Sequence, residues 1–388
     1  MYLSLNKWLE LFDTKYISYT KFLKIIKVKK NNGDIIKLKD YKKISNKIMK
    51  VFYGIIVLNK NTYLTNFYNK SLKVADADKY PLCLNNNKYI QYKNIVRNLY
   101  YKEILQETDT IQPNLKSFLN VIIDMYKNYI LDYKLLTPSV IKLIQKKALS
   151  NVLSGLYFRS SIMNPIVPYS LSTHIGYKFK VLTPTLGWSS YLIGMMKNKN
   201  LEEYVGIDVI NKVCNNTKKL ANKNKIKNDI YCKPSEDLYK DKIFMKNYKK
   251  YFDFIFFSPP YFQLELYKGK NQSTNRYKDY ESWLEKYWRE TVKLCYHTIK
   301  KDKLLIYIVS GYNDKKKYIN LEKDMNNVLI EEGFRYIKTI KMTGSNVGFT
   351  SHRKSDEKIF IFSSGNLNNN DNINHFKKVK KCKTIRKS

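Results

Sequence analysis

The chain has 388 residues, with 71 Lys and Arg against 33 Asp and Glu, which gives a net charge of +38. Its hydrophobic content of 44% excludes a wholly disordered chain, and no run of 18 apolar residues is present to span a membrane. The length suits two domains, or one domain with a large extension. A basic excess favours a polyanionic partner, nucleic acid ahead of an anionic membrane surface. A composition rich in Lys, Asn, Tyr and Ile, which have AT-rich codons, explains much of the excess equally well.

The cysteine pattern predicts neither a zinc site nor a disulfide framework, because the cysteines are scattered and no CxxC pair occurs. A reducing, intracellular compartment is the expectation. Residues 1–13 lack a long apolar core, so no signal peptide is expected. The five cysteines are Cys83, Cys214, Cys232, Cys295 and Cys382.

Residues 1–150 are expected to form a mixed, mostly helical region, with helices around residues 19–28 and 115–135. Tyrosines and lysines are interleaved here, notably over residues 89–102. Basic residues beside aromatic ones suit phosphate contact and base stacking. A solvated face with buried tyrosines is the favoured interpretation, and nucleic-acid recognition by this region stays open.

From about residue 150 the pattern changes to alternating strands and helices, which predicts an α/β fold with a parallel sheet covered on both faces. Ligands of such sheets lie at the carboxyl ends of the strands. The expected domains are therefore 1–150, a catalytic domain over 151–365, and a basic, disordered tail over 366–388. The expected strands are 179–182, 203–208, 229–233, 251–257 and 303–309, followed by an antiparallel pair at 334–342 and 358–362, and the expected helices begin at residues 190, 211 and 280.

The stretch that carries the chemistry is the apolar strand 251–257, which ends in Ser258, Pro259, Pro260 and Tyr261. The two prolines end the strand because they cannot donate hydrogen bonds. An exocyclic base amine is a poor nucleophile, since its lone pair is conjugated into the ring. The Ser258 hydroxyl and the Pro259 carbonyl can accept its two N–H groups and so let the nitrogen pyramidalise. Tyr261 can stack on a base that has been extruded from the duplex.

These residues resemble motif IV, [DNS]-P-P-[YFW], of the amino-group DNA methyltransferases. Glu265, Tyr267 and the stretch 280–283 make the likeness to phage and large-DNA-virus methylases closer. The resemblance implies a class I, Rossmann-like sheet, S-adenosylmethionine as cofactor, and Ser258, Pro259, Pro260 and Tyr261 as the catalytic residues. A structural Pro-Pro turn after a core strand is the alternative.

Residues 181–194 resemble motif I of the same viral group, where the pattern is roughly D-P-x-x-G-W-G-G-R-L. A strand, a tight glycine turn and a helix let the backbone approach the methionine part of the cofactor. The resemblance assigns cofactor contacts to Thr183, Thr185, Gly187 and Trp188. This sequence departs from the pattern at Thr183, Ser189, Ser190 and Tyr191.

Asp208 ends the next predicted strand, 21 residues after Gly187. A carboxylate at this place can accept hydrogen bonds from both ribose hydroxyls, and a helix cap is the alternative. Ser235 and Glu236 follow the third strand and resemble motif III, which meets the adenine amine of the cofactor. A helix start explains these two residues nearly as well.

The favoured function is methylation of adenine N6 or cytosine N4 in double-stranded DNA by direct transfer. No cysteine stands at a nucleophile position, which argues against cytosine C5 chemistry. The alternatives are an RNA or protein amide methyltransferase, and a catalytically degenerate fold that only binds nucleic acid. The viral resemblance implies the host cytoplasm or nucleus. A homodimer or a partner subunit stays open.

Overall fold

The computed structural model describes residues 16–41, 44–58, 80–100, 103–104, 108–109, 117–146, 149–314, 317–342 and 357–366. The chain divides into two compact units. The described part of unit 1 lies within residues 16–58 and 103–160, and that of unit 2 within residues 80–100 and 161–366. The first residues, where no signal peptide is expected, and the basic tail after residue 366 lie outside the described residues.

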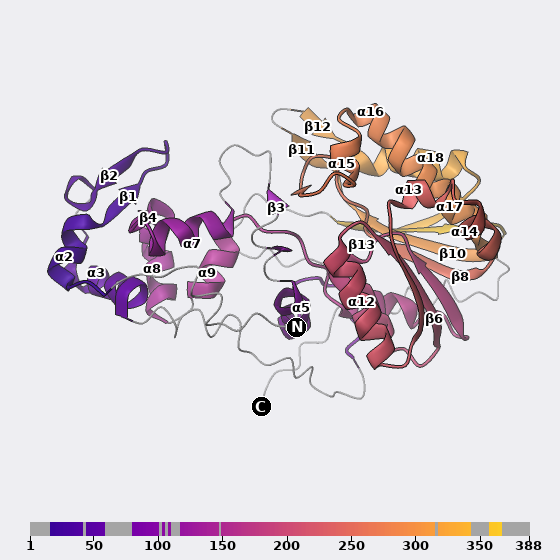
Figure 1. Cartoon of the computed structure of the whole chain (residues 1–388), viewed down its shortest axis with the longest axis horizontal. Helices are drawn as coiled ribbons and strands as arrows, with labels where there is room; N and C mark the ends of the chain where they lie inside the picture. Colours follow the sequence, from indigo (N-terminus) through magenta and orange to yellow (C-terminus); the bar gives the residue numbers. More distant parts are fainter. Residues whose placement is uncertain are drawn as a thin grey trace. The chain divides into compact units, whose positions relative to one another are not determined.

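Unit 1 combines a small sheet with short helices (Figure 1). Strand β1 (Lys27–Lys29) pairs antiparallel with β2 (Ile35–Lys37) and parallel with β4 (Ile130–Asp132). The other elements are α2 (Tyr19–Ile25), η1 (Leu38–Asp40), α3 (Asn46–Tyr53), the π-helix η2 (Gly54–Leu58), β3 (Thr108–Asp109), α7 (Phe118–Tyr126), η3 (Tyr133–Leu136), α8 (Pro138–Gln145) and α9 (Leu149–Leu156).

The two helices expected in this region are present but shorter than expected. Ser18 and Ser117 accept hydrogen bonds from backbone N–H groups of the first turns of α2 and α7, which explains where the helices begin. Each helix is soon followed by a strand. In β1, for example, Val28 is buried, whereas Lys27 before it is exposed and Lys29 after it is half-buried. Burial of every second residue is the pattern of a strand and not of a helix.

Unit 2 contains a seven-stranded sheet with the order β13-β14-β10-β8-β5-β6-β7. Strand β14 is antiparallel to both of its neighbours, and the pairings from β10 to β7 are parallel. This is the strand order of the class I methyltransferase fold, so the expected fold class is confirmed. The strands are β5 (Phe179–Thr183), β6 (Leu201–Asp208), β7 (Lys227–Cys232), β8 (Phe252–Phe257), β10 (Ile299–Val309), β13 (Arg335–Lys341) and β14 (Lys358–Ser363).

Helices cover both faces of this sheet, with α12 on one side and the group around α17 and α18 on the other (Figure 1). The helix expected from residue 280 is divided, because a π-helical segment joins its two α-helical parts. The other elements are α5 (Ile90–Leu99), α10 (Ile166–Ser172), η4 (Gly187–Ser189), α11 (Ser190–Met195), α12 (Asn211–Lys223), α13 (Ser235–Leu238), α14 (Lys242–Asn247), β9 (Leu266–Tyr267), α15 (Ser273–Arg276), α16 (Tyr280–Ser282), η5 (Trp283–Arg289), α17 (Glu290–Thr298), β11 (Tyr312–Asp314), β12 (Lys317–Ile319) and α18 (Leu321–Glu331).

The segment 80–100 belongs to unit 2, although the sequence places the domain boundary near residue 150. Hydrogen bonds hold it there: the Cys83 N–H donates to Ser170 Oγ at 2.8 Å, and Asn164 Nδ2 donates to the Lys88 carbonyl at 2.6 Å. Its Tyr100 is fully buried. Tyr92 and Lys93 are buried as well, whereas Lys88 and Tyr89 are half-buried, so part of the interleaved tyrosines and lysines belongs to the core.

Cys214 and Cys295 are buried free thiols and Cys232 is an exposed one, whereas Cys83 is disulfide-bonded, which the sequence did not predict. In the part of the chain that the structure describes, no group of three or more His, Cys, Asp or Glu side chains is arranged to bind a metal ion. None of the helices described combines the length and the apolar character that crossing a membrane requires.

Candidate active site

Ser258 lies at the carboxyl end of β8, between the ends of β5 and β10, and hydrogen bonds with Ile308, Tyr191 and Thr185 fix it. Its hydroxyl donates to the Ile308 carbonyl at 3.0 Å. Its N–H donates to the Tyr191 hydroxyl at 3.0 Å, and its carbonyl accepts the Thr185 hydroxyl at 3.1 Å. Because the hydroxyl proton is used by Ile308, the lone pairs of Ser258 Oγ are left to accept a donor.

Hydrogen bonds with Ser310, directly after β10, fix the Tyr261 hydroxyl. The Ser310 N–H donates to the Tyr261 hydroxyl at 3.1 Å, and the Ser310 hydroxyl lies 3.3 Å from it. The ring of Tyr312 meets the Tyr261 ring edge to face, with centroids 6.3 Å apart. Burial raises the pKa of Tyr261 well above its ordinary value, so the phenol stays neutral. The Pro259 carbonyl accepts no hydrogen bond from the described residues.

The loop after β5 has an unusual backbone. Gly187, Trp188 and Ser189 have consecutive positive φ angles of 52°, 59° and 60°. At Gly187 a Cβ atom would lie 2.2 Å from the Tyr191 ring, so only glycine fits there. Two consecutive residues other than glycine in this region cost about 1–2 kcal/mol each, and such strain is concentrated at functional sites.

Two of the departures from the motif I pattern, Thr183 and Ser189, make hydrogen bonds inside the fold. The Thr183 hydroxyl is buried and donates to the Tyr204 hydroxyl at 2.8 Å, which places it inside the fold. Ser189 Oγ lies 2.5 Å from Thr217 Oγ1 and also forms a hydrogen bond with the buried Tyr100 hydroxyl. A glycine at position 189 would lack both contacts.

Trp188 is packed between two other aromatic rings, with its centroid 5.7 Å from that of Tyr100 and 5.9 Å from that of Tyr267. The Tyr267 hydroxyl donates to the buried Glu265, whose carboxylate also accepts the Ser161 N–H at 2.9 Å. Glu265 and Tyr267, which the sequence links to motif IV, thus support the loop after β5 through Trp188.

Asp208 ends β6, where its carboxylate fixes two loops. One oxygen accepts the Leu186 N–H at 3.1 Å, and the other accepts the N–H groups of Val209 and Ile210 at 2.8 and 3.1 Å. Burial raises the pKa of Asp208, and these three N–H groups oppose that shift. The oxygen that accepts only the Leu186 N–H keeps capacity for a further donor.

Ser235 and Glu236 begin α13 at the end of β7. Ser235 Oγ lies 2.7 Å from Thr291 Oγ1, so its hydroxyl is used in packing α13 against α17. Arg276 donates to Glu236 at 2.7 Å and to Asp237 at 2.8 Å. Glu236 is only 2% exposed, and burial raises its pKa to about 7 in spite of Arg276.

Two hydroxyl groups near these residues were missed by the sequence analysis. Tyr287 Oη and Ser190 Oγ are buried and have no hydrogen-bond partner within the described residues. Burial, followed by the charges of Glu236, Cys295 and Asp208, raises the pKa of Tyr287. Tyr287 lies in the π-helix η5, a kind of segment that occurs often at functional sites and has no simple sequence signal.

A buried hydroxyl without a partner costs about 1–3 kcal/mol. Tyr287 and Ser190 therefore fit a polar ligand that supplies the missing bonds. Asp208 is placed to accept a hydroxyl donor at the same end of the sheet. The structure brings together the ends of β5, β6 and β8 as the sequence predicts, while the hydroxyls of Thr183 and Ser235 are engaged inside the fold.

No protein-family model matches the sequence, and no curated protein is significantly similar to it. Among solved structures, the [4+2]-cyclase SpnF is 9% identical, with 54% of this chain and 84% of that one covered and a TM-score of 0.36. A candidate S-adenosylmethionine-dependent methyltransferase from Streptococcus mutans is 12% identical, with 53% and 50% covered and a TM-score of 0.35. TrmN from Thermus thermophilus is 10% identical, with 52% and 49% covered and a TM-score of 0.35. The chain thus spans about half the length of the last two.

Proposed function

We propose that this protein is an S-adenosylmethionine-dependent methyltransferase that modifies an exocyclic base amine, adenine N6 or cytosine N4, in DNA. The observation that carries the proposal is the arrangement of Ser258, Pro259 and Tyr261 at the end of β8. They follow the central strand of a class I methyltransferase sheet, at the edge where such sheets bind ligands.

The cofactor, when bound, supplies an electrophilic methyl group. Asp208 is assigned to the ribose, and the backbone around Gly187 to the methionine part. Ser190 and Tyr287 have unsatisfied hydroxyls that fit a polar ligand. Glu236 is assigned to the adenine amine.

Thr185 and Trp188 are assigned to shaping the loop after β5, since Thr185 bonds Ser258 and Trp188 is packed between aromatic rings. The hydroxyls of Thr183 and Ser235 bond other side chains, so both residues are assigned to holding the strand ends in place. The cofactor contacts expected from the sequence thus divide into direct and supporting ones.

The residues of motif IV act on the target base. Ser258 Oγ and the Pro259 carbonyl accept the two N–H groups of the amine, which lowers the cost of making the nitrogen pyramidal. Ser258 does not act as a base in this scheme, because it donates its proton to Ile308. Tyr261 stacks on the extruded base, and its fixed ring reduces the entropy lost on positioning.

DNA is the proposed substrate because the net charge of +38 suits a polyanion and because motif IV resembles that of DNA methylases. The same resemblance supports a viral origin and action inside a host cell. A partner subunit or a homodimer is compatible with the proposal. A fold that only binds nucleic acid is the second candidate, favoured by the use of Thr183 and Tyr191 inside the fold.

The test is transfer of tritium from labelled S-adenosylmethionine to AT-rich and GC-rich duplex DNA, followed by chromatography of the nucleosides. Ser258→Ala removes the acceptor oxygen and is expected to lower transfer about 100-fold. Ser258→Asn is the matched control, because an amide oxygen can take the place of the hydroxyl, as the motif allows. It should recover a measurable part of the rate.

Label on N6-methyladenine or N4-methylcytosine, lost in the alanine variant, supports the proposal and identifies the base. Label on RNA or protein alone contradicts the DNA assignment. No transfer to any substrate, together with no cofactor binding by calorimetry, overturns the enzyme proposal and leaves the binding fold.

A further inference from the structure

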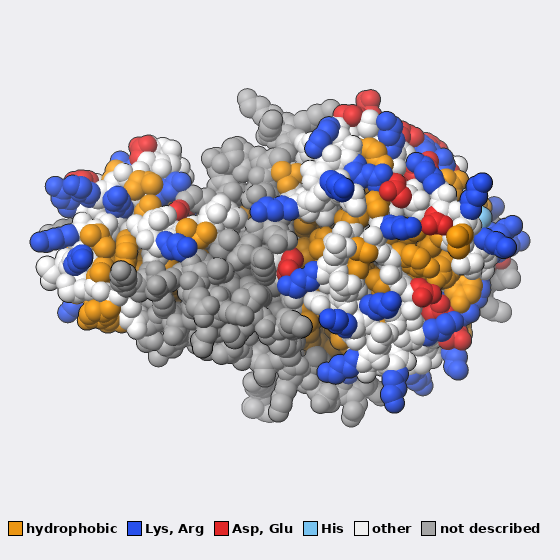
Figure 2. Space-filling model, in the orientation of Figure 1, with side chains coloured by type: hydrophobic (Ala, Val, Ile, Leu, Met, Phe, Trp, Pro, Cys, Tyr) orange, Lys and Arg blue, Asp and Glu red, His pale blue; other side chains and the backbone are white. Residues whose placement is uncertain are grey.

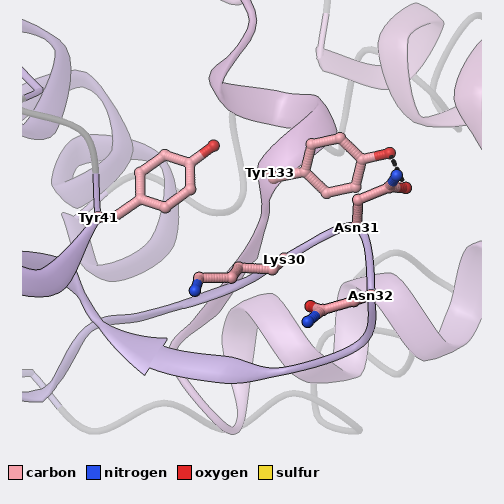
Figure 3. Close-up of a pocket in the computed structure, with 5 residues that line it drawn as sticks. All are labelled: Lys30, Asn31, Asn32, Tyr41 and Tyr133. Carbon is pink, nitrogen blue, oxygen red and sulfur yellow. Dashed lines mark hydrogen bonds between the residues drawn. The ribbon is translucent and has the colours of Figure 1, made fainter.

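Unit 1 has a pocket of its own, which is unrelated to the motifs discussed above. Figure 3 shows the rings of Tyr41 and Tyr133 on either side of the Lys30 side chain, with the hairpin turn after β1 beside them. The pocket is lined by Lys30, Asn31, Asn32, Tyr41 and Tyr133.

The polar groups of this pocket are chiefly donors. The Tyr133 hydroxyl donates to Asn31 Oδ1 at 2.6 Å, which leaves the Asn31 NH₂ group to donate elsewhere. Asn32 is tied to Asp34, which closes the turn. The ammonium of Lys30 forms no ion pair with a carboxylate of the described residues, and the Tyr41 hydroxyl has no hydrogen-bond partner among them. Lysine, asparagine and tyrosine are side chains that proteins use to contact phosphate oxygens.

The surroundings of the pocket are strongly basic. Residues 16–58 include eleven lysines against two aspartates and no glutamate or arginine. Lys27 and Lys37 are exposed and stand directly opposite each other across β1 and β2. Like charges at such paired positions destabilise a sheet, and a bound polyanion would relieve the repulsion. Figure 2 shows basic side chains spread over the visible face of this unit, with few acidic ones among them.

The shape of the pocket argues against a buried small ligand. Lys30, Asn31 and Asn32 are all exposed, and Tyr41 and Tyr133 are half-buried. Sites for small molecules usually bury most of the ligand in a largely apolar cleft. An open depression that carries the positive charge of Lys30 suits one unit of a long chain that continues past it on both sides.

We propose that this pocket binds a backbone phosphate of DNA, with Lys30 as the charged contact and with Asn31 and Tyr41 as neutral donors. The inference rests on the proposed function for the choice of DNA as the polyanion. A phosphate contact is independent of base sequence, so the pocket would position the duplex and leave sequence selection to other residues.

The experiment measures binding of the full chain to a fluorescein-labelled duplex by anisotropy, from about 50 to about 200 mM salt. Lys30→Ala is compared with Lys50→Ala, which removes an exposed lysine of α3 in the same unit that does not line the pocket. Loss of one phosphate contact should lower the slope of log K against log salt by about 0.9 and weaken binding about eightfold near 0.1 M salt. Tyr41→Phe, which keeps the ring, should weaken binding by a smaller factor.

The loss of DNA-binding affinity in Lys30→Ala should be equal for AT-rich and GC-rich duplexes. Equal salt slopes for Lys30→Ala and Lys50→Ala would overturn the proposal, as would a loss confined to one sequence. Stronger binding to RNA of the same length would overturn the choice of DNA. The anisotropy assay needs no methyl transfer. A protein that fails to methylate DNA but shows the loss in Lys30→Ala would therefore refute the proposed function and leave this site standing. Matching circular dichroism melts confirm that each variant is folded.

Discussion

The motif IV half of the candidate site and its cofactor half differ in how their polar groups are satisfied. In the motif IV half, the Ser258 hydroxyl and the Tyr261 hydroxyl both form hydrogen bonds with residues at the end of β10. Around Asp208 the situation is the reverse. Ser190 and Tyr287 have unsatisfied buried hydroxyls, and the pKa of Glu236 is raised to about 7.

This difference indicates that the motif IV half and the cofactor half have different functions. The motif IV half is rigid before any ligand arrives, which suits a site that must position a weak nucleophile. The cofactor half carries uncompensated polar groups, and these destabilise the free protein by amounts that a polar ligand can recover. The predictions below test this contrast, beginning with the largest expected effect.

Glu236→Gln should remove a pH dependence of stability that comes from the cofactor half. The pKa of Glu236 is about 7 in the folded chain against an ordinary value of 4.5. The folded state therefore binds more protons between these values, and stability falls as pH rises through this window. The wild type should lose up to about 3 kcal/mol of unfolding free energy from pH 4.5 to above pH 7 on this account.

The measurement is urea unfolding at both ends of that window. Glu236→Gln should flatten the profile and be the more stable protein at the alkaline end. Asp237→Asn removes the other carboxylate that Arg276 contacts and serves as the control. Most of the slope should remain, because burial raises the pKa of Glu236 more than the charge of Asp237 does. A wild-type profile without the fall would show that burial does not govern Glu236.

Tyr191→Phe tests whether the two halves are linked. The ring that covers Gly187 is kept, but the Ser258 N–H loses its acceptor, at a cost of about 2 kcal/mol in stability. Looser positioning of Ser258 should lower turnover about tenfold, while the dissociation constant of S-adenosylmethionine changes little. Tyr204→Phe is the matched control, because that buried phenol bonds Thr183 and not motif IV. Turnover that falls equally in both variants would contradict a specific link.

Tyr287→Phe separates stability from ligand binding in the cofactor half. Removing a buried hydroxyl that has no partner should stabilise the free protein by about 1–2 kcal/mol. The same change should weaken binding of S-adenosylmethionine about tenfold, because the ligand loses a hydrogen bond. Thermal melts with and without the cofactor report both effects. A variant that gains stability and keeps full affinity would place Tyr287 outside the ligand site.

The sequence predicts the sheet of unit 2 well, because its five inner strands contain runs of buried, mostly apolar residues. The strand expected at 203–208 is β6, and the one expected at 251–257 is β8 within one residue. The sequence could not show that the Thr183 hydroxyl bonds Tyr204, or that the Ser235 hydroxyl bonds Thr291. Those contacts join residues far apart in the chain, and no local pattern encodes them.

Ser189→Gly restores the glycine that the motif I pattern has at this position, and it should change stability least of all. Glycine removes about 1–2 kcal/mol of strain at φ 60°. It also gives up the bonds to Thr217 and to the buried Tyr100 and adds freedom to the unfolded chain. These terms oppose each other, so the net loss should be about 1 kcal/mol or less by urea unfolding. Ser45→Gly, at the start of α3, has no side-chain capping bond to lose and is the comparison for the unfolded-state term. A loss above about 3 kcal/mol would mean that the hydrogen bonds of Ser189 outweigh its strain. The serine would then be a requirement of this loop and not a tolerated departure from the pattern.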